Sequence, residues 1–261
     1  MNFIVYRVTG GINHMITSIN RAVQLSKKSG RFLIIDCNAG AFGNDFNDYF
    51  TIKGFDYSTN YDILYKKFYR GAFEPYKKAD IEIIEKKYYL NGKLLNVNFD
   101  EVLKSDEEII YLSMVSGIRN VAEYVSVKSE LMPEISKNPI KEKYIGVHYR
   151  NTDRRTNLGK IINQIKMLKT KIRTVYLGTD DAKAFDKFKR LLPDYEIIQY
   201  TKPIDLDGRN IHYGNKDKNE VIMTSLIDMF HLSRATYFIP SLPSGFSDRI
   251  LKIRLENTFF K

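Results

Sequence analysis

The chain has 261 residues, of which 43% are hydrophobic, and its Lys and Arg outnumber Asp and Glu by 41 to 31, giving a formal net charge of +10. This size and composition predict a folded protein of one large or two small α/β domains and exclude a disordered chain. The positive charge favours anionic partners such as nucleotides, phosphosugars, nucleic acid or an acidic membrane surface, without selecting one. Because the lysines are scattered along the chain, they predict a solvated surface better than a single nucleic-acid groove.

The cysteine content and the apolar runs restrict the class of protein further. A single cysteine, Cys37, excludes an internal disulfide and any site that needs several thiolates, which favours a reducing compartment. The apolar run at the N-terminus stops at Gly10 and is too short for a signal peptide or membrane anchor, and no later run reaches spanning length. These features predict a soluble, cytoplasmic protein.

The first third of the chain predicts a βαβ unit. The expected elements are a buried strand, a helix with apolar residues at helical spacing, and a second strand, at 3–8, 13–29 and 31–36. Gly30 is placed to end the helix. Gly10 and Gly11 precede it, where backbone N–H groups at a helix N-terminus could bind an anion. A tight turn explains this glycine pair equally well.

The middle of the chain carries weaker patterns. A β-hairpin is predicted over 88–95, with Asn91 and Gly92 at its turn. A polar, proline-containing stretch at 131–139 is the candidate connection between two halves. It predicts two domains, which cover residues 1–135 and 136–261.

In the second half, strand and helix patterns alternate. The predicted strands cover 144–149, 174–177, 196–200 and 237–240, and the predicted helices cover 158–169, 181–192 and 220–233. Strands separated by helices of this length indicate a parallel sheet covered on both faces. The expected fold class is therefore α/β, with two such halves facing a central cleft.

Polar residues follow three of these strands, and the run YIGVHYRNTD places His148, Arg150 and Asp153 at the end of the first. Because parallel strands end at the same edge of a sheet, segments 178–181 and 241–247 should lie beside them. The planar guanidinium of Arg150 suits a phosphate, since it forms paired charge-assisted hydrogen bonds and stays charged. A surface ion pair at a strand end is the alternative.

Two further positions could bind a nucleotide. Ser244, followed by Gly245 and Phe246, stands before a predicted helix and could offer its hydroxyl and backbone N–H groups to a phosphate, or simply cap the helix. Asp228 lies in an otherwise apolar helix, and its carboxylate matches the paired N–H donors of guanine. Helical spacing favours a solvated face for Asp228 as the alternative.

Four segments then carry a family resemblance: GVHYRNTDR at 146–154, YLGTDD at 176–181, LPDYEII at 192–198 and DMFHLSRATYFIPSLPSGFSDR at 228–249. In order and spacing they resemble the fucosyltransferase superfamily, which contains the α1,6-fucosyltransferases of N-glycan cores and rhizobial Nod factors and the protein O-fucosyltransferases. The opening Gly-Gly-Ile-Asn at 10–13 is similar to the Gly-Gly-Leu-Asn of the O-fucosyltransferases. Together the four segments cover nearly all of residues 144–250.

This resemblance implies a GT-B type enzyme with two Rossmann-like halves, a GDP-fucose donor held mainly by the C-terminal half, inversion at the sugar carbon, and no required metal or other cofactor. Arg150 would bind the β-phosphate and stabilise the leaving GDP. His148 and Asp228 would hold the guanine and ribose. The phosphates would also meet Ser244, Gly245 and Phe246, and from the N-terminal, acceptor-side half Gly10, Gly11 and Asn13.

The chain departs from the family pattern at several positions. Asn151 stands where the α1,6 enzymes have a second adjacent arginine, and Leu158 aligns near their glutamate beside the acceptor hydroxyl. An inverting transfer is helped by a carboxylate near the attacking hydroxyl, so Asp153 is the candidate base, or else it only orients Arg150. His14 and its neighbours replace the expected Gln-Arg, which predicts a diverged acceptor site.

The sequence therefore predicts a glycosyltransferase that moves fucose, or a related 6-deoxyhexose, from a GDP-sugar to a carbohydrate acceptor. The alternatives are a non-catalytic GDP-sugar or nucleotide-binding protein, a protein O-fucosyltransferase and, last, a nucleic-acid-binding protein, which the scattered lysines disfavour. The lysines and tyrosines of 49–89 could contact the acceptor or an anionic membrane, or form a solvated surface.

Overall fold

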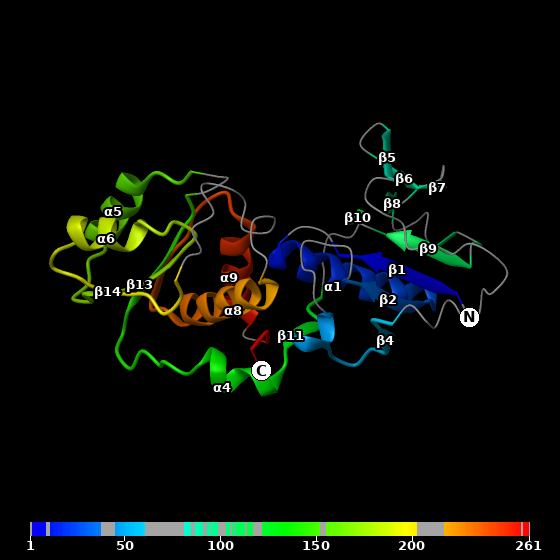
Figure 1. The fold of residues 1–261 in the computed structure, drawn as a ribbon, viewed down its shortest axis with the longest axis horizontal. Coiled ribbons are helices and arrows are strands. Elements are labelled where there is room, and N and C mark those ends of the chain that lie inside the picture. Colours follow the sequence, from blue (N-terminus) through cyan, green and yellow to red (C-terminus); the bar gives the residue numbers. More distant parts are fainter. Residues whose placement is uncertain are drawn as a thin grey trace. The chain divides into compact units, whose positions relative to one another are not determined.

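A computed structural model gives the architecture of the chain, which divides between Lys128 and Ser129 into two compact units (Figure 1). The sequence placed this boundary between residues 135 and 136. Unit 1 is residues 1–128 and unit 2 is residues 129–261, and each is described by itself. The structure describes residues 2–8, 11–37, 45–60, 81–84, 87–90, 93–94, 96–98, 103–104, 106, 108–112, 114–116, 122–151, 155–202, 217–256 and 258–260.

Unit 1 is built on a four-stranded sheet in which all neighbouring strands are parallel, in the order β4-β2-β1-β9 (Figure 1). These strands are β1 (Phe3–Arg7), β2 (Phe32–Asp36), β4 (Tyr57–Ser58) and β9 (Ile109–Leu112). Every residue of β1 is buried, which is why its sequence is a nearly continuous apolar run instead of an alternating one.

Helix α1 (Ile12–Ser29) connects β1 to β2 and packs on both. It buries an apolar stripe that contains Met15, Ile19 and Val23. The helix ends where Gly30 adopts a left-handed backbone, with φ at 66°, and donates its N–H to the Ser26 carbonyl oxygen. The βαβ unit predicted from the sequence is therefore confirmed.

The remaining elements of unit 1 form small additional sheets. Pairing is antiparallel in β3–β11 and in β5–β6–β7, and parallel in β8–β10. The predicted hairpin is confirmed by the pairing of β6 with β7, whereas its Asn-Gly turn lies outside the described residues. The bounds are η1 (Phe46–Asp48), β3 (Phe50–Ile52), β5 (Ile81–Ile84), β6 (Lys87–Leu90), β7 (Lys93–Leu94), β8 (Asn96–Asn98), β10 (Met114–Ser116) and β11 (Val125–Val127).

Unit 2 contains the second parallel sheet, in the order β14-β13-β12-β15. Its strands are β12 (Ile145–Tyr149), β13 (Thr174–Thr179), β14 (Glu196–Ile198) and β15 (Tyr237–Ile239). Its helices are η3 (Ser129–Leu131), α4 (Met132–Ile135), α5 (Leu158–Met167), α6 (Ala184–Leu191), α8 (Lys218–Arg234) and α9 (Gly245–Glu256). The predicted α/β alternation with parallel sheets is confirmed.

Helices cover both faces of this second sheet. Helices α5 and α6 bury Ile161, Ile165 and Phe188 against one face, where Val147 and Tyr149 of β12 also point. Helix α8 packs against β12 and β13 on the other face, with α9 beside it (Figure 1). Alternate residues of β12 therefore meet different helices. None of the helices in the described part of the chain is both long and apolar enough to cross a membrane.

Gly146 in β12 allows the end of α8 to approach the sheet closely. A Cβ atom built on Gly146 would lie 2.7 Å from the Ala235 Cβ, which is fixed to the backbone, and 3.5 Å from the Leu232 Cα. We expect Gly146→Ala to lower the free energy of unfolding by about 1–3 kcal/mol, measured by urea denaturation. In Gly178→Ala the closest contact, at 2.8 Å, is the flexible Leu232 Cδ1, so its loss should be smaller. Equal losses would contradict this account.

Candidate functional site

The order of strands in unit 2 creates a switch point between β12 and β15. From β12 the chain continues to β13 and β14 on one side of the sheet, and it then returns to place β15 on the other side of β12. In open α/β sheets the ligand binds in the crevice outside the carboxyl ends of two such strands. Arg150 directly follows β12, and Ser241 lies two residues beyond β15.

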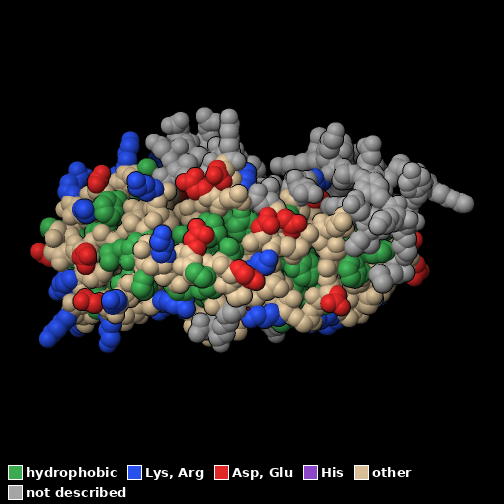
Figure 2. Space-filling model, turned by 60° about the horizontal axis from the view of Figure 1, so that its bottom comes forward, with side chains coloured by type: hydrophobic (Ala, Val, Ile, Leu, Met, Phe, Trp, Pro, Cys, Tyr) green, Lys and Arg blue, Asp and Glu red, His purple; other side chains and the backbone are tan. Residues whose placement is uncertain are grey.

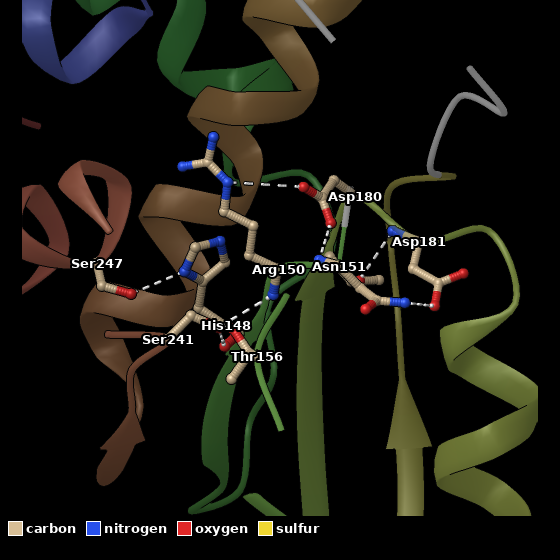
Figure 3. A network of polar contacts seen from close by, with 9 residues as sticks. His148, Arg150, Asn151, Thr156, Asp180, Asp181, Ser241 and Ser247 are labelled. Atoms are coloured by element: carbon tan, nitrogen blue, oxygen red, sulfur yellow. Dashed lines mark hydrogen bonds and ion pairs between the residues drawn. The ribbon is translucent and has the colours of Figure 1, made fainter. Parts of the chain in front are cut away.

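The Ser241 hydroxyl joins these two strand ends (Figure 3). It donates a hydrogen bond to the His148 carbonyl oxygen at 2.7 Å and accepts one from the Arg150 N–H at 3.0 Å. The Thr156 hydroxyl pairs with the same oxygen at 2.9 Å. Because the Ser241 side chain is buried, these bonds fix the backbone of Arg150 relative to the loop that follows β15.

Removal of this hydroxyl should release that backbone. In Ser241→Ala, the His148 carbonyl and the Arg150 N–H lose a buried partner, so we expect the free energy of unfolding to fall by about 1–3 kcal/mol in urea denaturation. Ser233→Ala is the matched control, because the Ser233 hydroxyl donates only to the Phe230 carbonyl within α8 and is partly exposed. If Ser233→Ala lowers the free energy of unfolding as much as Ser241→Ala does, the connection that Ser241 makes between the two strand ends has no special role.

The Arg150 side chain is held at its inner nitrogen. Its Nε lies 3.9 Å from Oδ2 of Asp180, which follows β13, and both side chains are about one-fifth exposed, at 21% and 17%. The other carboxylate oxygen of Asp180 accepts the Asn151 N–H at 2.7 Å. Figure 3 shows the two terminal guanidinium nitrogens directed away from Asp180. This orientation suits bidentate binding of an anion.

Asn151 ties the end of β12 to the end of β13. Its side-chain amide donates to Oδ2 of Asp181 at 2.9 Å, and Lys187 Nζ lies 2.9 Å from the same oxygen. Burial acts to raise the pKa of Asp181, but the hydrogen bonds from Lys187, the Lys183 N–H and Asn151 outweigh it and lower that pKa. Asn151 is therefore part of a connection between β12 and β13.

His148 is buried and points to the face of β12 opposite to that of Val147 and Tyr149. Its Nδ1 lies 2.7 Å from the Ser247 hydroxyl, and its ring centroid lies 4.9 Å from that of Phe246. Burial, together with the positive charge of Arg150, lowers the pKa of His148 to about 3. The imidazole is therefore neutral at any working pH.

Ser244 stands immediately before α9 and is 2% exposed. Among the described residues its hydroxyl has no hydrogen-bond partner, so it makes no side-chain cap, whereas its carbonyl accepts the Asp248 N–H at 3.0 Å. A buried hydroxyl without a partner is unfavourable unless a ligand satisfies it. Together with the N–H groups of the first turn of α9, it suits a phosphate oxygen.

Asp228 lies within α8 and is buried, so the solvated face considered for it is wrong. Its Oδ1 accepts hydrogen bonds from the hydroxyls of Tyr176 at 2.7 Å and Thr201 at 2.8 Å. Burial raises the pKa of Asp228 to about 7, although these two hydrogen bonds oppose the shift. Its Oδ2 lies beside Gly178, which pairs with His148 in the sheet.

The structure brings most of the predicted residues of the C-terminal half to one edge of the sheet. His148, Arg150, Ser244, Gly245 and Phe246 follow or end β12 and β15, and Asp228 lies behind β13. Gly11 and Asn13 lie at the start of α1 in unit 1. Gly10 and Asp153 lie outside the described residues.

Sequence reasoning missed the hydroxyls of Ser241, Tyr176 and Thr201. The signal for the last two was the carboxylate in an apolar helix, since a buried carboxylate requires donors. No group of three or more His, Cys, Asp or Glu side chains that could hold a metal ion occurs in the part of the chain that the structure describes.

No protein-family model matches the sequence, and no curated protein matches it either. Solved structures do match. Fucosyltransferase NodZ from Bradyrhizobium has a TM-score of 0.62 and 18% identity, over 96% of this chain and 92% of that chain. NodZ alpha-1,6-fucosyltransferase soaked with GDP-fucose has a TM-score of 0.61 and 19% identity, over 97% and 92%. POFUT1 in complex with GDP has a TM-score of 0.58 and 11% identity, over 98% and 96%.

These matches extend over nearly the whole of each chain and include both units. At such low identity they show the fold, which is the α/β, GT-B type fold of the fucosyltransferase structures. The fold class implied by the sequence resemblance is therefore confirmed.

Proposed function

We propose that the protein is an inverting, metal-independent glycosyltransferase that moves fucose, or a related 6-deoxyhexose, from GDP-fucose to a hydroxyl of a carbohydrate acceptor. The observation that carries the proposal is the placement of Arg150 at the switch point of a fucosyltransferase-type fold, together with the Ser244 hydroxyl, which precedes α9 and has no hydrogen-bond partner among the described residues. The similar NodZ and POFUT1 structures contain GDP-fucose or GDP, which supports a GDP-sugar as the donor. The cysteine content supports a cytoplasmic location.

In the proposed reaction, the bond between the sugar anomeric carbon and the β-phosphate oxygen breaks while the acceptor oxygen attacks the opposite face of that carbon. Negative charge develops on the β-phosphate, where the Arg150 guanidinium stabilises it more in the transition state than in the substrate. Ser244 and the N-terminus of α9, with Gly245 and Phe246, bind the remaining phosphate oxygens. A fixed guanidinium thus takes the role that a metal cation plays in other transferases.

The guanine is assigned to Asp228 and His148. Oδ2 of the Asp228 carboxylate can accept an N–H group of guanine, because the hydrogen bonds from Tyr176 and Thr201 both go to Oδ1. The neutral His148 ring is fixed by Ser247 and brings no positive charge that would compete with Arg150 for the diphosphate.

The N-terminal half, residues 1–135, is assigned to the acceptor, and residues 136–261 to the donor. Gly10, Gly11 and Asn13 would contact the diphosphate from that half. Helix α1 begins after Gly11 without a side-chain cap, which supports an anion at its first turn. Asp153 is the proposed base that receives the proton of the acceptor hydroxyl.

The proposal is tested by titrating the full chain with GDP and with UDP in EDTA, followed by a turnover assay with GDP-fucose and a panel of glycan acceptors. We expect micromolar GDP binding without metal, weaker UDP binding, and GDP release that depends on an acceptor. Absence of GDP binding would reject the donor site. GDP binding without turnover on any acceptor would reject the enzymatic assignment.

A non-catalytic GDP-sugar-binding protein is the second candidate, and two observations favour it. Leu158, aligned near the family's glutamate, packs against the apolar core of unit 2, and Asn151 is engaged between the strands. Such a protein would bind GDP-fucose without transfer. For nucleic-acid binding, a continuous basic face would be needed, whereas on the face shown in Figure 2 acidic side chains lie among the Lys and Arg side chains.

A further inference from the structure

Unit 1 contains a cavity of about 740 Å³ where α1 ends and β2 begins. It lies at the opposite end of α1 from Gly11, and the 18 residues of that helix span about 27 Å. Aromatic side chains of its lining come from Phe32 and Phe55. Polar side chains of the lining come from Ser26, Lys27, Arg31 and Asp56. The cavity is therefore separate from the start of α1, and it has a volume typical of small-ligand sites.

A buried hydroxyl in the lining lacks a partner. Ser26 is 1% exposed, and its hydroxyl has no hydrogen-bond partner among the described residues. The Ser26 carbonyl, in contrast, accepts the N–H groups of Gly30 and Arg31 at the helix end. Because an unsatisfied buried hydroxyl is unfavourable, a polar ligand group in the cavity would relieve it.

The rest of the lining includes a positioned cation, a carboxylate and an aromatic ring. Lys27 Nζ lies 4.4 Å from the Tyr124 ring centroid and 5.7 Å from that of Phe55, so cation–π contacts fix the ammonium group. Asp56 is exposed and accepts hydrogen bonds, and Phe55 is half-buried. Donors, an acceptor and an aromatic ring thus meet at one cavity.

This combination selects the chemical class of the ligand. Hydroxyl groups both donate and accept, so they can use Asp56 and the Lys27 ammonium together, and the C–H face of a pyranose ring packs on an aromatic side chain. A phosphate would meet Lys27 and Arg31, but it would also meet Asp56 and the partial negative charge at the C-terminal end of α1, and it has no apolar face for the Phe55 ring. We propose that the cavity binds hexopyranose units of a glycan. This extends the proposed function, since such a site would hold an acceptor chain away from the reacting hydroxyl.

The test is saturation-transfer NMR on the full chain with mannotetraose, cellotetraose and chitotetraose as probes. We expect at least one to bind the wild type. Phe55→Ala should weaken that binding about tenfold or more because the ring platform is lost, and Asp56→Asn should weaken it by a similar factor because a charged acceptor is lost. Asp48→Asn, an exposed carboxylate of unit 1 outside the cavity, is the matched control and should bind as the wild type does.

Two results would overturn the inference: no binding of any of the three probes, or binding that is unchanged in both Phe55→Ala and Asp56→Asn. Both variants are also titrated with GDP, which confirms that they are folded and separates this site from the donor site. Glycan binding that is lost while GDP binding is kept supports the cavity. If the wild type does not bind GDP, the proposed donor site is rejected, but glycan binding by the wild type and the variants still tests the cavity.

Discussion

Arg150→Ala is expected to weaken GDP binding by about 2–5 kcal/mol, which corresponds to a factor of about 30 to several thousand in Kd. The substitution removes a fixed cation and leaves the phosphate without its bidentate partner. The Arg150 backbone N–H remains bonded to Ser241, so the loop should keep its conformation. Isothermal titration in EDTA gives the affinity of the wild type and the variant directly.

Two variants define what the arginine contributes. Arg150→Lys keeps the charge and loses the planar fork, so we expect an intermediate affinity. Arg190→Ala removes an exposed arginine from the last turn of α6 and should bind GDP as the wild type does. An Arg150→Ala affinity equal to that of Arg190→Ala would mean that Arg150 forms only a surface ion pair with Asp180.

Guanosine affinity should rise with pH between about 6 and 8 if Asp228 accepts hydrogen bonds from the base. Burial raises the pKa of Asp228 to about 7, and a proton on Oδ2 would remove the acceptor proposed for the base. Below the pKa, affinity should fall by up to about tenfold per pH unit. Guanosine is the probe because it lacks the phosphates, whose own titration would obscure the effect. Affinity that is independent of pH would remove Asp228 from the base site.

Asp228 should also make the stability of the fold depend on pH. Its folded pKa of about 7 exceeds the unfolded value of about 3.9, so the folded state retains a proton that the unfolded state loses. The free energy of unfolding should therefore fall as pH rises from 4 to 7, by at most about 4 kcal/mol. The free energy of unfolding of Asp228→Asn, measured relative to that of the wild type by urea denaturation, should therefore be higher at pH 8 than at pH 5. A constant difference between the two proteins would contradict the shift.

The two buried histidines act in the opposite direction. Burial, with a nearby arginine, lowers the pKa of His148 to about 3 and that of His231 to about 4. Because the unfolded chain takes up protons at these positions below about pH 6.5, they reduce stability as pH falls through that value. The comparison of Asp228→Asn with the wild type cancels their contribution.

The local patterns of the sequence predicted the elements well, because each depends on neighbours along the chain. The apolar run of β1, the helical stripe of α1 and Gly30 sufficed for the βαβ unit. The polar run after β12 also predicted the position of Arg150 at the carboxyl edge of the sheet, since parallel strands end at one edge. The sequence placed segment 241–247 beside this strand end, but it did not single out the Ser241 hydroxyl, because the exact register of β12 with β15 decides its contact with His148, 93 residues away.

The environment of Asp228 was mispredicted for a related reason. Helical spacing assigns a polar residue to the solvent when one face of the helix is free. Helix α8 instead packs against both the sheet and α9, and its residues 228–232 are all buried. The donors from Tyr176 and Thr201 come from distant elements, so only the tertiary structure reveals that a carboxylate is accommodated there.

The position of Asp228 in the proposed donor site has a consequence for how nucleobase preference can evolve. Its carboxylate is fastened to β13 through Tyr176 and to the segment after β14 through Thr201. Replacement of Asp228 by a residue without an acceptor oxygen, toward recognition of another nucleobase, would leave the hydroxyls of Tyr176 and Thr201 without their acceptor. That substitution would lose stability before it gained a new specificity. Descendants of this chain should diversify their acceptors readily, through exposed segments, while the nucleotide they use stays the same.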